Sequence, residues 1–248
     1  MRVAGIDIGS CTTKLVVIED GEAVEWSLLP TGADPLKAVR ALIGDRTFER
    51  IAATGYGRKL AVGSVAGGAL TEVKAAATGA HALSPECRTV IDIGGQDVKV
   101  IALDGNGGFT DFAMNDRCAA GTGRFLEVMA RTLGFDLEQF GHISAGTEGS
   151  LRLSSMCAVF AESEVISLIA RGEDPRVIAR AVHEAVADRI SALARTIAAR
   201  SDTTMLAGGV ARNACMVRLL EAKLGVPLIV HERAQYVAAL GAALMANQ

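Results

Sequence analysis

Two short stretches of the 248-residue chain combine glycine, hydroxyl and carboxylate groups in a pattern suited to binding phosphate. Residues 7–14 read D-I-G-S-C-T-T-K and residues 92–99 read D-I-G-G-Q-D-V-K, so both follow D-I-G-x-x-x-x-K. Glycine lets the backbone N–H groups of such a turn approach phosphate oxygens closely. The aspartate ahead of each turn, Asp7 or Asp92, could hold a magnesium ion or orient an attacking water. A repeated turn of this kind predicts a nucleotide site.

We assign both turns to nucleotide phosphates and a later glycine pair, Gly208-Gly209, to adenosine. The candidates for catalysis are Asp7, Asp92 and Gln96. The candidate nucleotide-binding residues are Gly9, Ser10, Cys11, Thr12, Thr13, Lys14, Gly94, Gly95, Gln96, Asp97, Gly208, Gly209, Val210, Asn213 and Gly241. The sequence G-x-x-x-x-G-K-[ST] is absent from the chain, which excludes a P-loop enzyme.

Cys118 and Cys157 are the candidate metal ligands. The residues after each cysteine begin a helical pattern of apolar side chains, such as Phe125, Leu126 and Met129 after Cys118. Both thiols are therefore expected near helix N-termini, where free N–H groups and the helix dipole favour a thiolate. Zinc and four-iron clusters usually take four ligands, which a two-fold dimer would supply. Lone cysteines in an intracellular protein are more often small buried apolar residues.

Composition narrows the class of protein. Lys and Arg number 25 against 28 Asp and Glu, giving a net charge of −3, and there is no basic run, so nucleic-acid binding is not expected. Five cysteines at wide spacing do not predict a disulfide framework. The N-terminus lacks the pattern of a signal peptide, and no apolar run reaches transmembrane length. We expect a cytoplasmic protein without a membrane partner.

The elements that would position these residues recur along the chain. The first series comprises strands at 1–9, 14–18, 24–29 and 50–54 and helices at 35–43 and 72–83. The second comprises strands at 88–93, 98–103, 109–114, 203–207 and 227–230, two cysteine-headed helices, and helices at 175 to about 199, 213–224 and 235–246. This duplication predicts an α/β fold with two similar halves facing a nucleotide cleft. We place residues 1–86 plus 235–248 in the first half and 87–234, with both cysteines, in the second.

The D-I-G turns and the late Gly-Gly turn resemble those of the actin, sugar kinase and Hsp70-type ATPases, whose halves are ribonuclease H-like. Within that fold the chain resembles the ATP-dependent activators (component A) of 2-hydroxyacyl-CoA dehydratases and the related ATPase subunits of benzoyl-CoA reductases, the BadF/BadG/BcrA/BcrD-type family. The matching stretches are Gly5–Ser10, Thr54–Arg58, Asp92–Asp97, Cys118–Gly123, Phe160–Val165 and Gly208–Ala211. The two cysteine stretches are the specific ones, because the wider fold shares the turns.

The resemblance implies a homodimer with one [4Fe-4S] cluster at its interface, held by Cys118 and Cys157 of each chain. It implies Mg²⁺-dependent hydrolysis of ATP to ADP, which drives a low-potential electron to a CoA-thioester dehydratase or reductase component. Ferredoxin or flavodoxin would be the electron donor. Two departures leave the subgroup open: Lys74-Ala75 stands where many relatives have Cys-His, and Cys11 stands where threonine is common.

Our preferred hypothesis is an activator of a 2-hydroxyacyl-CoA dehydratase. The alternatives within the family are an ATPase subunit of a benzoyl-CoA reductase-type enzyme and an ATP-dependent reductase of a double-cubane-cluster protein. A small-molecule kinase of the same fold is less favoured, because the chain is short for a sugar kinase and a kinase needs no cysteine-headed helices. A nucleotide-regulated scaffold that binds a cluster without transferring an electron is the last alternative.

Overall fold

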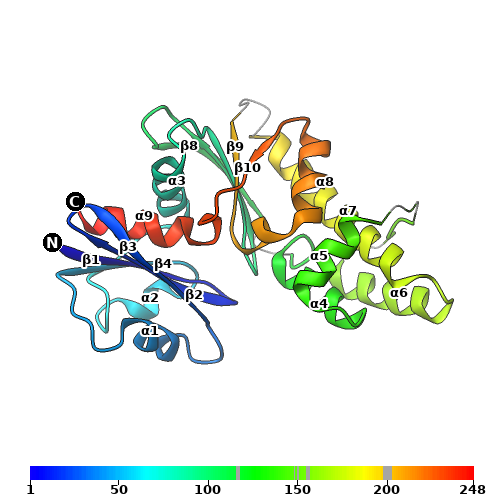
Figure 1. Ribbon diagram of the computed structural model, residues 1–248, viewed down its shortest axis with the longest axis horizontal. Coiled ribbons are helices and arrows are strands. Elements are labelled where there is room, and N and C mark those ends of the chain that lie inside the picture. Colours follow the sequence, from blue (N-terminus) through cyan, green and yellow to red (C-terminus); the bar gives the residue numbers. More distant parts are fainter. Residues whose placement is uncertain (116–117, 148, 150, 155–156, 198–202) are drawn as a thin grey trace.

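The computed structural model describes residues 1–115, 118–147, 149, 151–154, 157–197 and 203–248. Its framework is a pair of five-stranded sheets, which lie in separate parts of an elongated molecule (Figure 1). The first sheet has the order β3-β2-β1-β4-β5, from β1 (Arg2–Ile8), β2 (Thr12–Glu19), β3 (Glu22–Pro30), β4 (Arg50–Thr54) and β5 (Gly68–Ala69). The second has the order β10-β9-β6-β7-β8, from β6 (Thr89–Ile93), β7 (Val98–Leu103), β8 (Phe109–Asn115), β9 (Thr204–Ala207) and β10 (Leu228–Ile229).

The two sheets are built alike, which confirms the predicted duplication. In the first, β1, β2 and β3 form an antiparallel meander and β4 runs parallel to β1. In the second, β6, β7 and β8 form the meander and β9 runs parallel to β6. The register repeats as well, because Asp7 lies opposite Lys14 and Asp92 lies opposite Lys99. Both D-I-G turns therefore sit at the same corner of their sheets.

The helices α3 (Glu72–Leu83) and α9 (Val237–Ala246) lie together between the two sheets (Figure 1). Helix α9, at the C-terminus, packs Ala239 and Leu240 into the core of the first sheet. Helix α3 packs Ala76 and Ala77 against the second sheet. The last helix of each series thus covers the sheet that is formed by the other series. The alanine-rich faces of α3 and α9 allow this close packing. The division of the chain into two domains at residues 86 and 234 stays a prediction.

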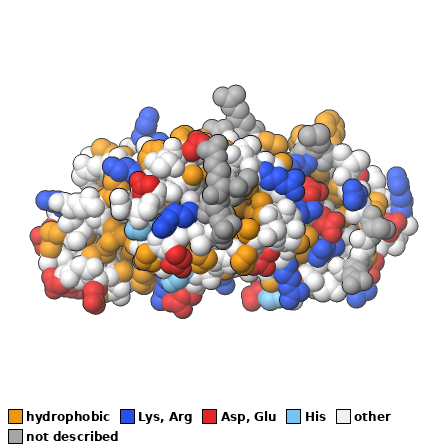
Figure 2. Space-filling view, turned by 90° about the horizontal axis from the view of Figure 1, so that it is seen from above, with side chains coloured by type: hydrophobic (Ala, Val, Ile, Leu, Met, Phe, Trp, Pro, Cys, Tyr) orange, Lys and Arg blue, Asp and Glu red, His pale blue; other side chains and the backbone are white. Residues whose placement is uncertain are grey.

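The remaining helices cover the outer faces of the sheets and extend the second half. They are α1 (Pro35–Ile43), α2 (Arg58–Ala61), α4 (Gly123–Thr132), α5 (Leu137–Ala145), α6 (Ala158–Ala170), α7 (Pro175–Arg195), α8 (Ala214–Leu224) and the 3₁₀ turns η2 (Gly209–Arg212) and η3 (Ala234–Tyr236). Helices α4 to α8 gather around one large core with the second sheet. Among the described helices, none has both the length and the apolar character to cross a membrane. Basic and acidic side chains are interspersed on the face shown in Figure 2.

Two expected helices differ from the structure, and one helix was not expected. Helix α4 begins at Gly123 and not at Cys118, because Gly121 has a φ of +106° and Thr122 is extended. A separate helix, α5, follows the left-handed Gly134 and was not foreseen. The helix expected to run to about residue 199 ends at Arg195. Residues 198 and 199 lie outside the described part of the chain.

Candidate functional site

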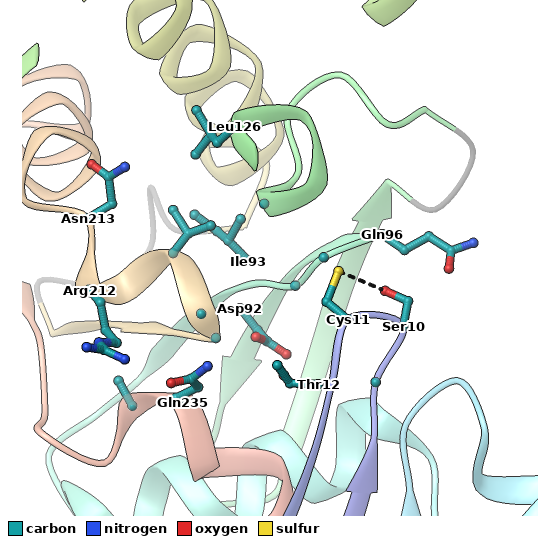
Figure 3. Close-up of a pocket in the computed structure, with 18 of the residues that line it drawn as sticks. Ser10, Cys11, Thr12, Asp92, Ile93, Gln96, Leu126, Arg212, Asn213 and Gln235 are labelled. Carbon is teal, nitrogen blue, oxygen red and sulfur yellow. Dashed lines mark hydrogen bonds between the residues drawn. The ribbon is translucent and has the colours of Figure 1, made fainter. Parts of the chain in front are cut away.

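A cleft of about 450 Å³ lies where the ends of β1 and β6 face each other. Fifteen of the residues that the sequence assigns to catalysis or nucleotide binding line it, and two do not. The lining members are Asp7, Gly9, Ser10, Cys11, Thr12, Lys14, Asp92, Gly94, Gly95, Gln96, Asp97, Gly208, Gly209, Val210 and Asn213. Figure 3 shows Ser10, Cys11 and Thr12 on one side of the cleft and Arg212 and Asn213 on the other.

The two D-I-G turns have the same internal geometry. The N–H of Gly9 donates to the carbonyl of Thr12 at 3.1 Å, and the N–H of Gly94 donates to that of Asp97 at 3.0 Å. The turns also approach each other, since a Cβ on Gly95 would lie 2.4 Å from the Sγ of Cys11. A side chain at that position would collide with the first turn. The close approach therefore accounts for glycine there.

Each strand-end aspartate lies beneath a glycine from the neighbouring parallel strand. A Cβ on Gly55, which has a φ of +89°, would lie 2.5 Å from the Oδ1 of Asp7. A Cβ on Gly208, with a φ of +83°, would lie 2.6 Å from the Oδ1 of Asp92. Gly55 follows β4 and Gly208 follows β9, so the two halves build the same arrangement twice. Gly208 is therefore required by the aspartate site as well as by the candidate adenosine site.

The charges around the two aspartates are not equivalent. Asp7 forms an ion pair with Lys14 at 2.9 Å, and both side chains are only 12% exposed. Lys99, the counterpart of Lys14, instead contacts Asp97 and Glu72, each at 2.7 Å. Asp92 is therefore left without an ion-pair partner among the described residues. Of the two aspartates, Asp92 is therefore the one whose carboxylate could take a cation from the cleft.

Burial raises the pKa of Asp92 to about 6, against the opposing charge of Lys99 and with support from the negative charges of Asp97 and Asp7. The Asp92 side chain projects into the cleft beside Thr12 (Figure 3). Burial lowers the pKa of Lys14, but the charge and hydrogen bond of Asp7 together with the charges of Asp92 and Cys11 outweigh burial, so the pKa is raised. A cation bound near Asp92 would favour its ionised form.

Thr13 and Gly241 lie elsewhere, and their assignment to the nucleotide site is corrected. Successive side chains of a strand point to opposite faces, so Thr13 of β2 points away from the cleft. Its hydroxyl is buried and lies 3.0 Å from that of Thr31. Thr31 in turn donates to the carbonyl of Gly9, so Thr13 supports the turn from behind. Gly241 lies where α9 crosses α3, and a Cβ there would come within 1.8 Å of the carbonyl oxygen of Ala75.

The cleft also contains residues that the sequence analysis did not assign to catalysis or nucleotide binding. They are Tyr56, Glu72, Ile93, Lys99, Gly123, Leu126, Glu127, Leu137, Glu138, His142, Arg212, Ala214, Ala234, Gln235, Val237 and Ala238. Arg212 could have been found from its place between Val210 and Asn213. Leu137, Glu138 and His142 come from α5, whose boundaries the apolar pattern did not reveal.

The two candidate cluster ligands are exposed, whereas Cys87 and Cys215 are buried. Burial raises the pKa of each buried thiol to about 11, so these two act as small apolar core residues. Cys157 is the N-cap of α6, as expected, whereas Thr122 holds that place in α4, so the expectation for Cys118 was wrong. Within the described residues, three or more His, Cys, Asp or Glu side chains nowhere gather as a metal site.

Two duplicated α/β halves with a phosphate-type turn on each side of one cleft define the actin, sugar kinase and Hsp70-like class of ATPases. A glucokinase of the ROK family from Streptomyces griseus shares the fold, with a TM-score of 0.62, 13% identity and full coverage of both chains. Residues 4–246 match the BadF/BadG/BcrA/BcrD ATPase family, and the chain belongs to it.

Two solved structures show how closely the chain follows this family. Component A of (R)-2-hydroxyglutaryl-CoA dehydratase from Acidaminococcus fermentans superposes with a TM-score of 0.92 at 40% identity, over 99% of this chain and 97% of that one. The activator of 2-hydroxyisocaproyl-CoA dehydratase from Clostridium difficile, with bound ADPNP, gives 0.91 at 39% identity, over 99% and 94%.

A dehydratase activator and a benzoyl-CoA reductase subunit differ in their sequence identity to this chain. The activator of lactoyl-CoA dehydratase from Anaerotignum propionicum is 42% identical over 100% of this chain and 98% of its own length. One of the subunits of benzoyl-CoA reductase from Thauera aromatica is 32% identical over 97% and 91%. The chain is thus more similar to these dehydratase activators than to the reductase protein.

Proposed function

We propose that this protein is an ATP-hydrolysing iron–sulfur protein that activates a 2-hydroxyacyl-CoA dehydratase by transferring a low-potential electron to it. The observation that carries the proposal is the joint presence of the duplicated cleft and two exposed cysteines in a chain about 40% identical to such activators over nearly its whole length. A kinase of the same fold would need the cleft but not the cysteines.

The cleft fits a nucleotide in size and chemistry. Its volume of about 450 Å³ falls in the range of small-molecule sites. Free N–H groups of the turns around Gly9 and Gly94 would hold the phosphates. Asp92 would anchor Mg²⁺, directly or through water, or orient the attacking water. The segment from Gly208 to Asn213 would hold the adenosine, since Gly209 leaves space beside its backbone.

Cys118 and Cys157 fit a cluster shared between two chains. Both thiols are exposed. The N–H groups at the start of α6 also favour an anionic group beside Cys157. Two chains related by a two-fold axis would bring four thiolates together. When bound, the cluster would supply one-electron chemistry at low potential. Helix α6 exposes Val159 and Phe160, each 68% accessible, next to Cys157, and such a surface is suited to pairing with a second copy.

A nucleotide in this cleft would contact both halves, so it would favour the arrangement in which they close around it. The second half carries α4 and α6, and these helices lead directly from the cysteine segments. A change in the second half would therefore reach the cluster's surroundings, which tune its potential. Ferredoxin or flavodoxin would reload the cluster between cycles. The higher identity to dehydratase activators favours a dehydratase as acceptor over a benzoyl-CoA reductase.

Iron and sulfide analysis with size determination, all under anaerobic conditions, tests this proposal. We expect about four irons per dimer in the parent protein. Cys118→Ser and Cys157→Ser should each lose the iron yet keep ADP binding, because the cleft is built from other segments. The matched controls are Cys87→Ala and Cys215→Ala, which remove buried thiols and should keep the iron. A Cys157→Ser protein with a full cluster, or an iron-loaded monomer, would refute the shared site.

A further inference from the structure

The imidazole of His183, in the middle of α7, is fully buried and hydrogen-bonded at both ring nitrogens. Its Nδ1 lies 2.8 Å from the carbonyl oxygen of Ala179, and its Nε2 lies 3.0 Å from the amide Nδ2 of Asn213. The ring of Phe140 packs against it, with 4.4 Å between centroids. Neither the proposed hydrolysis nor the cluster uses this histidine directly, so the burial of a polar ring here needs its own explanation.

The chemistry of the contacts fixes the state of the ring. A carbonyl oxygen only accepts hydrogen bonds, so Nδ1 of His183 carries the proton and donates to Ala179. Nε2 is then the acceptor for the amide N–H of Asn213. Burial lowers the pKa of His183 to about 4, with the charge of Arg180 acting in the same direction, so the ring is neutral at neutral pH. The neutral Nδ1–H tautomer satisfies both contacts at once.

Asn213 connects this histidine to the cleft. It lines the cavity and is also the N-cap of α8, where its Oδ1 accepts from the N–H of Met216 at 3.0 Å. With Nδ2 on His183 and Oδ1 on Met216, the amide has one orientation. Gly141 of α5 makes room for it, since a Cβ there would lie 3.0 Å from the Asn213 Cγ and Oδ1. Figure 3 shows the Asn213 side chain directed away from Arg212.

We propose that His183 is a positioning residue for the nucleoside part of the ligand, acting through Asn213 on the segment from Gly209 to Asn213. The proposal rests on the nucleotide site proposed above. Without the Nε2 acceptor, the Asn213 amide loses its buried partner and its fixed orientation. The start of α8 and the η2 turn would then no longer be held in one place against the adenosine. The phosphate turns at Gly9 and Gly94 would not be affected, because they belong to other strands.

Calorimetric titration of the 248-residue protein with ADP and with inorganic pyrophosphate tests the inference, with melting temperatures measured alongside. His183→Leu should weaken ADP binding about ten-fold, the size expected for one lost buried hydrogen bond, and leave pyrophosphate binding as in the parent. His183→Gln should restore most of the ADP affinity, because its amide oxygen can accept from Asn213. Equal ADP affinity in His183→Leu and the parent would overturn the inference.

A double-mutant cycle separates positioning from general loss of stability. Asn213→Ser keeps an N-cap hydroxyl for α8 but cannot reach His183. It should weaken ADP binding like His183→Leu, and the double variant should be no weaker than either single one. Fully additive losses would overturn the inference. If the parent bound neither ADP nor pyrophosphate, the nucleotide site itself would be wrong, and the inference would fail with it.

A measurement on the parent protein covers the case in which the variants do not fold. Long-range ¹H–¹⁵N spectra of the histidine rings should show one ring as the neutral Nδ1–H tautomer at neutral pH. The acceptor nitrogen of that ring should shift when ADP is added and stay in place when pyrophosphate is added. A His183 ring in the Nε2–H form, or a His183 ring that does not respond to ADP, would contradict the inference.

Discussion

The repeat places an aspartate and a lysine at the same two positions in each half, yet only Asp92 is left free for a cation. The cause lies in two neighbouring residues. Asp97 occupies the place that Thr12 holds in the first repeat, and Glu72 begins α3 close by. These two carboxylates bind Lys99 and draw it away from Asp92. A small difference between the repeats therefore gives the two aspartates different electrostatic surroundings.

Asp92→Asn should reduce ATP turnover about 100-fold or more, the range typical of a lost catalytic carboxylate or metal anchor. The amide is isosteric and needs no counter-charge, so the fold should persist. Steady-state phosphate release measures the effect. Asp45→Asn, an exposed aspartate outside the cleft, is the matched control. Turnover in Asp92→Asn equal to that of the control would remove Asp92 from the proposed mechanism.

The buried His183 predicts how stability depends on pH. Its pKa is lowered from 6.5 to about 4 in the folded chain, so between these values the unfolded chain binds the proton more readily. Stability from this group is therefore complete above pH 6.5 and is lost as the pH falls toward 4, by on the order of 3 kcal/mol. Denaturant unfolding of the parent and His183→Gln across this range measures it. Parallel pH profiles for the two proteins would contradict the prediction.

At the scale of elements, local signals predicted the helices that have strong start sites. Helix α1 begins at Pro35 after the capping Asp34, and α7 begins at Pro175 after Asp174. The start of α4 was missed, because Gly121 and Thr122 interrupt a pattern that otherwise looks helical from Cys118 onwards. The spacing of apolar side chains indicates a helix. It does not reveal a turn in the backbone, such as the one at Gly121 with its positive φ.

The crossing of α3 and α9 is another feature that a pattern of single residues could not reveal. A Cβ on Gly79 would lie 1.9 Å from the carbonyl oxygen of Val237, and one on Gly241 would lie 1.8 Å from that of Ala75. The two glycines face each other across the helix pair. The sequence analysis assigned Gly241 to the nucleotide site, although a glycine in a helix can make room for a neighbouring helix as well as for a ligand.

Gly241→Ala should lower the melting temperature, because the added methyl group meets the backbone of α3 rather than a movable side chain. The expected net loss is about 1–3 kcal/mol, after the better helix propensity of alanine has returned about 1 kcal/mol. Thermal unfolding of the variant and the parent measures the difference. Gly105→Ala, where the added Cβ would meet nothing within 4 Å, is the control. A Gly241→Ala protein as stable as the parent would contradict this packing.

At the scale of the whole molecule, the sequence repeat predicted the two sheets and the cleft between them. The repeat predicted that Asp7, Asp92 and the two turns meet at the cleft, because they hold equivalent positions at the corners of two similar sheets that face each other. It did not predict that α3 covers the second sheet, nor that α5 contributes Leu137 and His142 to the cleft. Those features depend on packing between segments that lie far apart in the chain, and no single stretch of sequence encodes such packing.

The proposed function joins the cleft and the cysteines in one cycle, and each part can be removed separately. Asp92→Asn should keep the iron and lose turnover. Cys157→Ser should keep nucleotide binding and lose the iron. If ATP hydrolysis drives electron transfer, neither variant should transfer electrons, although Asp92→Asn keeps the cluster and Cys157→Ser keeps the nucleotide site.

Activation of purified dehydratases for 2-hydroxyglutaryl-CoA, 2-hydroxyisocaproyl-CoA and lactoyl-CoA is the most direct test. The reduced protein, kept free of oxygen, is mixed with each dehydratase and its substrate, and formation of the unsaturated acyl-CoA is followed with and without ATP. We predict that product forms with at least one of these dehydratases only when both ATP and the parent protein are present, and that Asp92→Asn and Cys157→Ser are inactive. Product formation that needs no ATP, or a Cys157→Ser protein as active as the parent, would contradict an ATP-driven transfer of electrons from a cluster.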